Sequence, residues 1–499
     1  MNTITGLLDN GQDEATALLG SDGAALDWRT VRGVVAQLAD QLRSAGVGPA
    51  DRVAIVMPDG VEMALISLAV MTVGCAAPLN PTYVENEYRF HLEDLGVRVL
   101  ITPEGAMPAA HAAAPTGTRI LFVRGRAASL DLVCDQASPV SGDTPEKDRI
   151  SLALHTSGTT SRPKIVALRQ SQLVRSALQI AETLQLTDSD RSLIVMPLFH
   201  IHGLLIGLLA PLVAGGSVVC TPGFDPFEFH GWLRSHEPTY YTASPTVHQN
   251  VVVMGRPRAN ARTSLRFVRS ASAALPRRVE EDLRELFGVP VIEAYGLTES
   301  SGQVTSNPLP PAAAKPGSVG LPTGVEVRIL DKTGAELPPE RRGEVGLRGP
   351  TLIAGYENNP VANETTFNDG WFRTGDEGHL DEDGYLYLTG RLKEQINRGG
   401  EKVGPWEIDK VVLENPAVVH AVSFAIPHPT LGEDIGVAVT LEPESQITAD
   451  ELRTFMAARL APFKVPTKIV FVDEIPKGPT GKLQRRGLAN TLGLTDGSS

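Results

Sequence analysis

The segment ISLALHTSGTTSRPKIV, residues 150–166, runs from an apolar stretch into small hydroxyl and glycine residues and then to one lysine. Backbone N–H groups, short hydroxyl side chains and a cation are the groups with which proteins hold phosphate oxygens. The apolar run predicts a strand, and the periodic segment after the loop predicts a helix. A loop at the carboxyl end of a sheet strand is a common phosphate site in α/β proteins. The candidate ligands are Thr156, Ser157, Gly158, Thr159, Thr160 and Lys164, and a plain surface turn is the alternative.

This loop differs from the phosphate loop of P-loop kinases. That motif needs Gly, Lys and then a hydroxyl residue for magnesium. Here Pro163 and Lys164 are followed by Ile165. The P-loop kinase interpretation is therefore disfavoured.

Composition and charge narrow the function classes. The chain has 499 residues, too many for one core, with 42% hydrophobic and 21% charged residues and a net charge of −13. We expect no nucleic-acid partner, because no clustered basic face is evident. No signal peptide or membrane span is expected, and three cysteines without a CxxC pair favour a reducing, cytoplasmic location. The net negative charge of the chain repels an anionic ligand, so local cations must hold such a ligand.

Short apolar runs alternate with helical patterns along the first three hundred residues. This alternation predicts an α/β fold with doubly wound parallel sheets. From about residue 310 the pattern changes to Gly- and Pro-rich β segments, and a smaller α+β pattern follows GRLKEQI. We predict a large N-terminal domain, residues 1–391, with doubly wound sheets and a β-rich subdomain. A small mobile α+β C-terminal domain would comprise residues 392–499.

Six motifs in fixed order resemble the adenylate-forming superfamily of acyl-CoA synthetases, adenylation domains and luciferases. They are HTSGTTSRPKIV, MPLFHIHG, EAYGLTE, WFRTGD, GRLKEQI and PTGKLQRR. The resemblance extends over essentially the whole chain. Among subgroups, the motifs are most similar to those of oxalate-activating CoA ligases. The resemblance implies an AMP-forming acid–thiol ligase that uses ATP, Mg²⁺ and coenzyme A.

The resemblance also implies roles for individual residues. Lys482 would lie between the carboxylate and the α-phosphate, where negative charge develops, although a solvated tail lysine is the ordinary alternative. Glu299 would be the magnesium ligand, and His200 and Lys393 join the catalytic set as motif histidine and hinge lysine. Besides the loop residues, the nucleotide and CoA set comprises Ser272, Glu293, Ala294, Tyr295, Gly296, Thr298, Asp376, Tyr387, Arg391, Gly399 and Gly400.

Transfer to coenzyme A would follow a rotation of the small domain about Lys393. Gly399 and Gly400 would let a thioester arm pass close to the backbone, and a plain hairpin turn is an equal alternative. Arg398 and Arg485 are candidate contacts for the CoA phosphates. Two other interpretations stay open: an enzyme that loads a carrier protein, and a partial homologue that only performs the transfer step. A monomer or homodimer is expected.

The predicted acyl pocket comprises His200, His202, Ser270, Ser272 and Gly302. Gly302 stands where the oxalate type carries a histidine, so one donor is missing and the pocket should gain volume. We therefore expect oxalate to be a poor substrate and a bulkier acid to be preferred. Ile165, in place of a usual glycine, is expected to stiffen the phosphate loop or weaken its grip on ATP.

Lys482→Ala is predicted to abolish adenylate formation and to leave transfer from a supplied acyl-adenylate largely intact. The lysine charge is needed only while charge develops at the α-phosphorus. Pyrophosphate exchange and thioester formation, measured separately, test this. Equal loss of both half-reactions would mean that Lys482 has a structural role.

Overall fold

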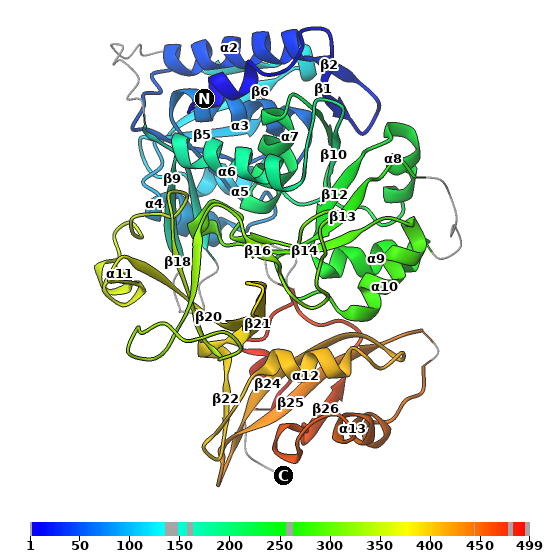
Figure 1. Cartoon of the computed structure of the whole chain (residues 1–499). Coiled ribbons are helices and arrows are strands. Elements are labelled where there is room, and N and C mark those ends of the chain that lie inside the picture. The colour runs from blue at the N-terminus through cyan, green and yellow to red at the C-terminus, as the bar shows by residue number, and fades with distance from the viewer. Residues whose placement is uncertain are drawn as a thin grey trace.

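The computed structural model describes residues 2–134, 148–156, 163–255, 263–443, 445–477 and 483–494. Two large sheets with parallel centres form the N-terminal part, a third sheet lies below them, and a fourth lies at the C-terminal end of the molecule (Figure 1). The expected α/β class with doubly wound sheets is confirmed. Among the described residues, no helix combines the length and apolar character that crossing a bilayer requires.

The first sheet has seven strands in the order β7-β6-β5-β3-β4-β8-β9. Its central pairs are parallel, and the edge pairs β6–β7 and β8–β9 are antiparallel. The strands are β3 (Arg52–Ile55), β4 (Cys75–Pro78), β5 (Val99–Pro103), β6 (Arg119–Arg124), β7 (Asp131–Cys134), β8 (Ile150–Thr156) and β9 (Lys164–Arg169).

The second sheet has nine strands in the order β16-β15-β14-β13-β12-β10-β11-β1-β2. Strands β14 to β1 run parallel, and antiparallel strands close both edges. The strands are β1 (Thr16–Gly20), β2 (Ala25–Asp27), β10 (Arg191–Ile194), β11 (Ser217–Cys220), β12 (Tyr240–Ala243), β13 (Phe267–Ser270), β14 (Val291–Tyr295), β15 (Thr305–Ser306) and β16 (Leu321–Pro322).

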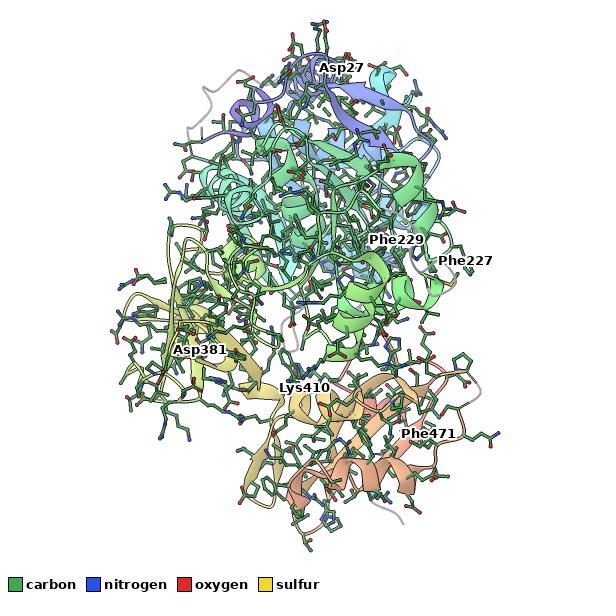
Figure 2. The ribbon with its side chains drawn as sticks, turned by 45° about the vertical axis from the view of Figure 1, so that its right-hand side comes forward. Asp27, Phe227, Phe229, Asp381, Lys410 and Phe471 are labelled. Carbon is green, nitrogen blue, oxygen red and sulfur yellow. The ribbon has the colours of Figure 1, made fainter. Side chains whose placement is uncertain are left out.

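Helices cover the faces of both sheets (Figure 1). Asp27 caps α2 by accepting a hydrogen bond from the Thr30 N–H. Asp27 lies at the top of the molecule in the view of Figure 2. The helices of this part are α1 (Ile4–Leu8), α2 (Trp28–Ser44), α3 (Val61–Val73), α4 (Glu85–Asp94), α5 (Pro108–Ala113), α6 (Gln170–Thr183), α7 (Ala210–Val213), α8 (Phe229–His236), α9 (Pro245–Gly255) and α10 (Arg277–Phe287).

The apolar segment after MPLFH forms a buried helix, but its hydrogen bonding is not α-helical throughout. Residues His202–Leu209 form a π-helix that leads directly into α7. All eight of its residues are buried. Because π-helices are rare and occur often at functional sites, this geometry draws attention to His202.

Two smaller sheets complete the chain. The third contains β17 (Glu326–Leu330), β18 (Gly343–Arg348), β19 (Phe367–Asn368), β20 (Trp371–Leu380) and β21 (Leu386–Arg391), with α11 (Pro360–Thr366) beside it. The fourth contains β22 (Ile396–Arg398), β23 (Glu401–Val403), β24 (Val418–His428), β25 (Gly432–Leu441) and β26 (Lys468–Phe471). Its helices are α12 (Pro405–Val412), α13 (Ala449–Ala457) and α14 (Leu488–Thr491).

The fourth sheet has a hydrophobic core of its own, built around Ile408, Val437 and Leu452. Polar contacts join it to the N-terminal part. Gln249 Nε2 donates to the Val419 carbonyl at 2.9 Å. Lys410 of α12 lies at this junction, with its Nζ 3.9 Å from where a Cβ on Gly317 would stand (Figure 2). A hydrophobic core of its own is typical of a separate domain.

A buried ion-pair cluster ties the hinge segment to this C-terminal part. Arg485 donates to Asp409 Oδ2 at 2.7 Å and to Glu394 Oε2 at 3.2 Å, and it also donates to the Ser423 carbonyl. The Arg485 side chain is 16% exposed and that of Asp409 is 13% exposed. Arg485 is therefore committed to internal carboxylates, which argues against the expected contact with CoA phosphates.

Arg485→Met is expected to destabilise the C-terminal part by about 3–5 kcal/mol, because it leaves the Asp409 carboxylate buried without its cation. Thermal unfolding followed by calorimetry measures the change. Lys468→Met, at an exposed position of the same sheet, is the matched control and should shift the transition little. Equal shifts in both variants would contradict the structural role of the ion pair.

Candidate active site

The site is built on the carboxyl end of β14 and on the turn that follows it. Gly296 directly after the strand packs so closely that a Cβ there would stand 1.6 Å from the Gly302 carbonyl oxygen. Only glycine fits this approach. A single 3₁₀ turn, Thr298–Ser300, then presents Glu299, whose carbonyl accepts a hydrogen bond from the Ile353 N–H at 2.9 Å. The glycine and the tight turn together place Glu299 directly after the carboxyl end of β14.

A buried carboxylate joins β14 to the third sheet. Tyr295 Oη donates to Asp376 Oδ2 at 2.5 Å, and Arg391 Nε forms an ion pair with Asp376 Oδ1 at 2.8 Å. Asp376 is 2% exposed. Burial raises the pKa of this carboxyl, and the Arg391 guanidinium opposes that rise. Three predicted nucleotide-binding residues from distant parts of the sequence are thus in direct contact.

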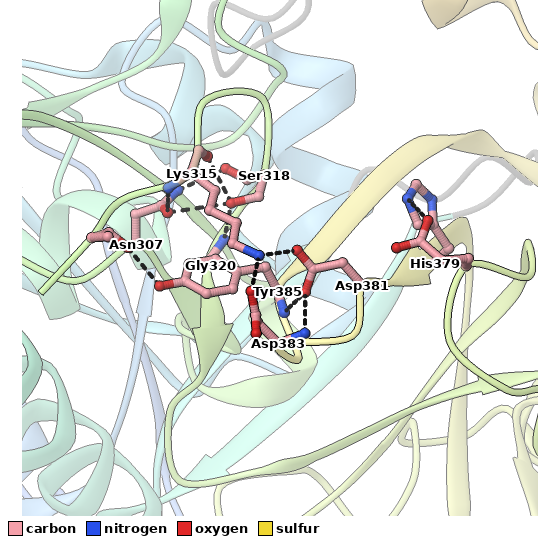
Figure 3. A network of polar contacts seen from close by, with 10 residues as sticks. Asn307, Lys315, Ser318, Gly320, His379, Asp381, Asp383 and Tyr385 are labelled. Carbon is pink, nitrogen blue, oxygen red and sulfur yellow. Dashed lines mark hydrogen bonds and ion pairs between the residues drawn. The ribbon is translucent and has the colours of Figure 1, made fainter.

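The hairpin that carries Asp376 and Arg391 is anchored at its turn by a polar network (Figure 3). Lys315 Nζ donates to Asp381 Oδ2 at 2.5 Å and to Asp383 Oδ2 at 2.6 Å, and it lies 4.6 Å from the Tyr385 ring centroid. Because these contacts link the loop after β15 to the β20–β21 turn, they help to set the position of the hairpin.

The predicted phosphate lysine and the predicted metal ligand meet at a residue that the sequence analysis missed. Lys164 Nζ lies 4.2 Å from the Tyr356 ring centroid. Tyr356 Oη donates to Glu299 Oε1 at 2.7 Å. Burial lowers the pKa of the Lys164 amine, the charge of Lys393 lowers it further, and Glu299 opposes both. Tyr356 ends the segment TLIAGY, where an aromatic residue after Gly was the available signal.

Five predicted site residues fall outside the described residues: Ser157, Gly158, Thr159, Thr160 and Lys482. Thr156 is described as the last residue of β8 and pairs with Lys164. Ile165 is 3% exposed and packs in the hydrophobic cluster that includes Val56 and Leu100. Its side chain therefore belongs to the core beneath the loop.

The predicted acyl residues group around the π-helix. His200 Nδ1 accepts from the His202 N–H at 3.2 Å, and His202 Nδ1 lies 3.0 Å from Ser272 Oγ. Ser270 is 1% exposed, and its hydroxyl has no hydrogen-bond partner within the part of the chain that the structure describes. Ser272 adopts φ of +77°, which is unusual for a residue with a side chain.

The expected gain of pocket volume at Gly302 is wrong. Gly302 has φ of +102°, and a Cβ there would stand 2.9 Å from Leu205 Cδ2 and 3.4 Å from Ile206 Cδ1. The space beside the glycine is filled by the π-helix side chains. A residue with a side chain would be strained and would collide, so Gly302→His cannot restore an imidazole without local rearrangement.

The remaining predicted residues occupy defined positions. Glu293 accepts from the Leu275 N–H at 3.2 Å, and burial raises the pKa of its carboxyl to about 7. Ala294 is buried on β14 beside it, and Thr298 opens the 3₁₀ turn. Tyr387 stacks on His379 with ring centroids 5.1 Å apart.

The hinge and the glycine pair lie on either side of β22. Lys393 is the middle residue of a 3₁₀ turn, Leu392–Glu394, between the third and fourth sheets. Gly399 and Gly400, with φ of +61° and +100°, form the turn of the β22–β23 hairpin. Arg398 forms an ion pair with Asp434 at 2.8 Å, so this predicted CoA contact is already engaged.

Comparisons with known proteins agree with this geometry. The AMP-binding enzyme family matches residues 9–357, and its C-terminal domain matches residues 407–482. Oxalate–CoA ligase from Arabidopsis thaliana is 41% identical over 98% of both chains, and that from Saccharomyces cerevisiae is 40% identical over 89% of this chain and 87% of its own. The crystal structure of ATP-bound MatB from Rhodopseudomonas palustris superposes with a TM-score of 0.87 at 28% identity, over 98% and 99% of the two chains.

Tyr356→Phe is expected to raise the KM for MgATP about tenfold or more, because it removes a hydrogen bond to a charged group and keeps the ring under Lys164. Tyr356→Leu should add a further loss, since it also removes the cation–π contact, worth about 0.5–2 kcal/mol. Pyrophosphate exchange at varied MgATP measures both effects. Unchanged KM values in the two variants would show that Tyr356 only packs.

Proposed function

Because this chain belongs to the AMP-binding enzyme family and is an ATP-dependent acyl-CoA ligase, we propose specific roles for its site residues. Glu299, Lys164 and Tyr356 would hold the phosphates, and Asp376 would accept hydrogen bonds from the ribose. The observation that carries this assignment is the contact of Tyr356 with both Glu299 and Lys164. It places a carboxylate and a cation side by side, as a bound metal–phosphate group requires.

In the first half-reaction, a carboxylate oxygen of the acid attacks the α-phosphorus of ATP. The bond from that phosphorus to the pyrophosphate oxygen breaks, and acyl-AMP forms. Two anions approach each other in this step, so cations must lie where charge develops. Lys482 is proposed at the α-phosphate and Lys164 at the outer phosphates. The lowered pKa of Lys164 reflects partial burial, which also strengthens its attraction for phosphate.

Glu299 is the proposed magnesium ligand. Among the described residues, no group of three or more His, Cys, Asp or Glu side chains could hold a metal alone. A single carboxylate facing a triphosphate fits magnesium, which takes one or two carboxylates and keeps several waters. When bound, the ion would neutralise charge on the phosphates. Tyr356 would orient the carboxylate through its hydrogen bond to Oε1.

In the second half-reaction, the thiol of coenzyme A attacks the acyl carbon, and AMP leaves. We propose that the C-terminal part, residues 392–499, turns about Lys393 between the two steps, with the domain boundary after Arg391. The separate core of the fourth sheet supports this division. Gly399 and Gly400 would then border the path of the thioester arm. We also propose that the protein is a cytoplasmic monomer or homodimer.

For the acid, we infer a short molecule that carries a second anionic group. The filled space at Gly302 removes the argument for a bulky acid, since Leu205 and Ile206 close that side. The polar side chains of His200, His202 and Ser272 are grouped by hydrogen bonds. Similarity to oxalate–CoA ligases points to the same class. The missing donor at Gly302 still predicts that oxalate itself is not the best substrate.

The acid preference is tested with anionic acids and their apolar isosteres. Malonate is paired with isovalerate, and oxalate with isobutyrate, because an isopropyl group has the shape of a carboxylate. With ATP, magnesium and coenzyme A, we expect kcat/KM for malonate to exceed that for isovalerate at least tenfold and also to exceed that for oxalate. Mass spectrometry of the acyl-CoA products identifies turnover. A preference for the apolar member of both pairs would refute the proposed substrate class.

A further inference from the structure

A fully buried arginine lies behind the predicted acyl pocket. Arg269 on β13 is 1% exposed and is among the largest fully buried side chains of the described part of the protein. Within that part, no ion pair joins it to a carboxylate; its partners are neutral side chains. Burial lowers the pKa of its guanidinium to about 10, so the group stays charged at neutral pH. A buried charge without a counter-ion is costly, and proteins that retain one commonly use it.

The Arg269 guanidinium contacts two residues that neighbour predicted pocket residues. Its Nη2 donates to Gln303 Oε1 at 3.0 Å, and Gln303 directly follows Gly302. Its Nη1 donates to Thr242 Oγ1 at 3.1 Å. Thr242 and Arg269 are register partners on the parallel strands β12 and β13, so their side chains lie side by side on one face of the sheet. The π-helix packs on this same face, where Tyr240 Oη donates to the Ile206 carbonyl.

From Thr242 the contacts continue to the pocket. Thr242 Oγ1 lies 2.6 Å from His202 Nε2, and His202 Nδ1 lies 3.0 Å from Ser272 Oγ. One assignment of the hydrogens has Thr242 Oγ1 accepting from Arg269 and donating its own hydrogen to His202 Nε2. In that assignment the imidazole is neutral, with its proton on Nδ1, which donates to Ser272 Oγ. Each bond in such a chain polarises the next.

These contacts end at the Ser272 hydroxyl. With Ser272 accepting from His202 in this assignment, its own hydrogen can be donated to a ligand. Ser272 is partly exposed and is held at φ of +77°, whereas the neighbouring Ser270 is buried. A strained residue at the end of an ordered network is typical of a binding site.

We propose that Arg269, Thr242 and His202 are positioning residues that set the Ser272 hydroxyl as a hydrogen-bond donor to the second anionic group of the acid. This inference rests on the proposed function, since it assumes that the acid carries such a group. No carboxylate among the described residues pairs with the charge of Arg269. It acts through Thr242 and His202 and favours negative charge at Ser272. The alternative is that these contacts only hold β12 against β13.

Thr242→Val tests the chain, because valine keeps the shape of threonine and removes the hydroxyl. We expect kcat/KM for malonate in pyrophosphate exchange to fall about ten- to a hundredfold, as for loss of a hydrogen bond to a charged group. The value for isovalerate should change less than threefold. Thr242→Ser restores the hydroxyl and should recover the malonate value to within about threefold. Arg269→Gln should lower the ratio of kcat/KM for malonate to kcat/KM for isovalerate. Circular dichroism should show that this variant remains folded.

Thr221→Val is the matched control. Thr221 is 1% exposed, and its hydroxyl donates to the Ile194 carbonyl at 2.6 Å, outside the chain from Arg269. This variant should keep the wild-type ratio of malonate to isovalerate. A loss of both acids in equal proportion in Thr242→Val, or failure of Thr242→Ser to recover the ratio, would overturn the proposal. A wild-type enzyme that prefers isovalerate would instead refute the proposed substrate class.

Discussion

The arrangement of the site depends on the buried carboxylate of Asp376, which bonds to both Tyr295 and Arg391. An ionised carboxylate is unfavourable in the interior unless it is paired, and both of its partners come from elsewhere in the sequence. Tyr295 belongs to the nine-stranded sheet, and Arg391 is the last residue of β21. One electrostatic requirement therefore joins the third sheet to the second, next to the proposed hinge.

Positive charge at the site is built locally, in a chain whose net charge is −13. Lys164 lies over an aromatic ring, and Arg269 is surrounded by neutral hydrogen-bond acceptors. Within the described ranges neither is bonded directly to a carboxylate, so both keep an unbalanced positive charge at short range. By contrast, Arg398 and Arg485 are paired within the C-terminal part and serve its stability. Cations without a bonded carboxylate can therefore act on ligands, whereas the paired arginines stabilise the fold.

Two substitutions relative to the expected motifs show how neighbours decide the effect of a residue. Gly302 was expected to enlarge the pocket, yet Leu205 and Ile206 of the π-helix occupy the space beside it. Ile165 was expected to stiffen the phosphate loop or weaken its grip on ATP; its side chain is buried among apolar residues of the first sheet, and its effect on the loop stays a prediction. In both cases the chemical character of the residue was evident, and the space around it was not.

The amino-acid order alone determined the α/β class, the alternation of strands and helices in the N-terminal part, and the motif residues Lys164, Glu299 and Asp376. These follow from periodicity and from short motifs, in which every group is within a few residues of the next. Only the tertiary structure decided the contacts of Tyr356 with Glu299, of Arg269 with Thr242, and of Thr242 with His202. Their partners are separated by 57, 27 and 40 residues, and strand register and helix packing bring them together. Local pattern specifies which groups are present, whereas the packing of distant elements specifies which of them touch.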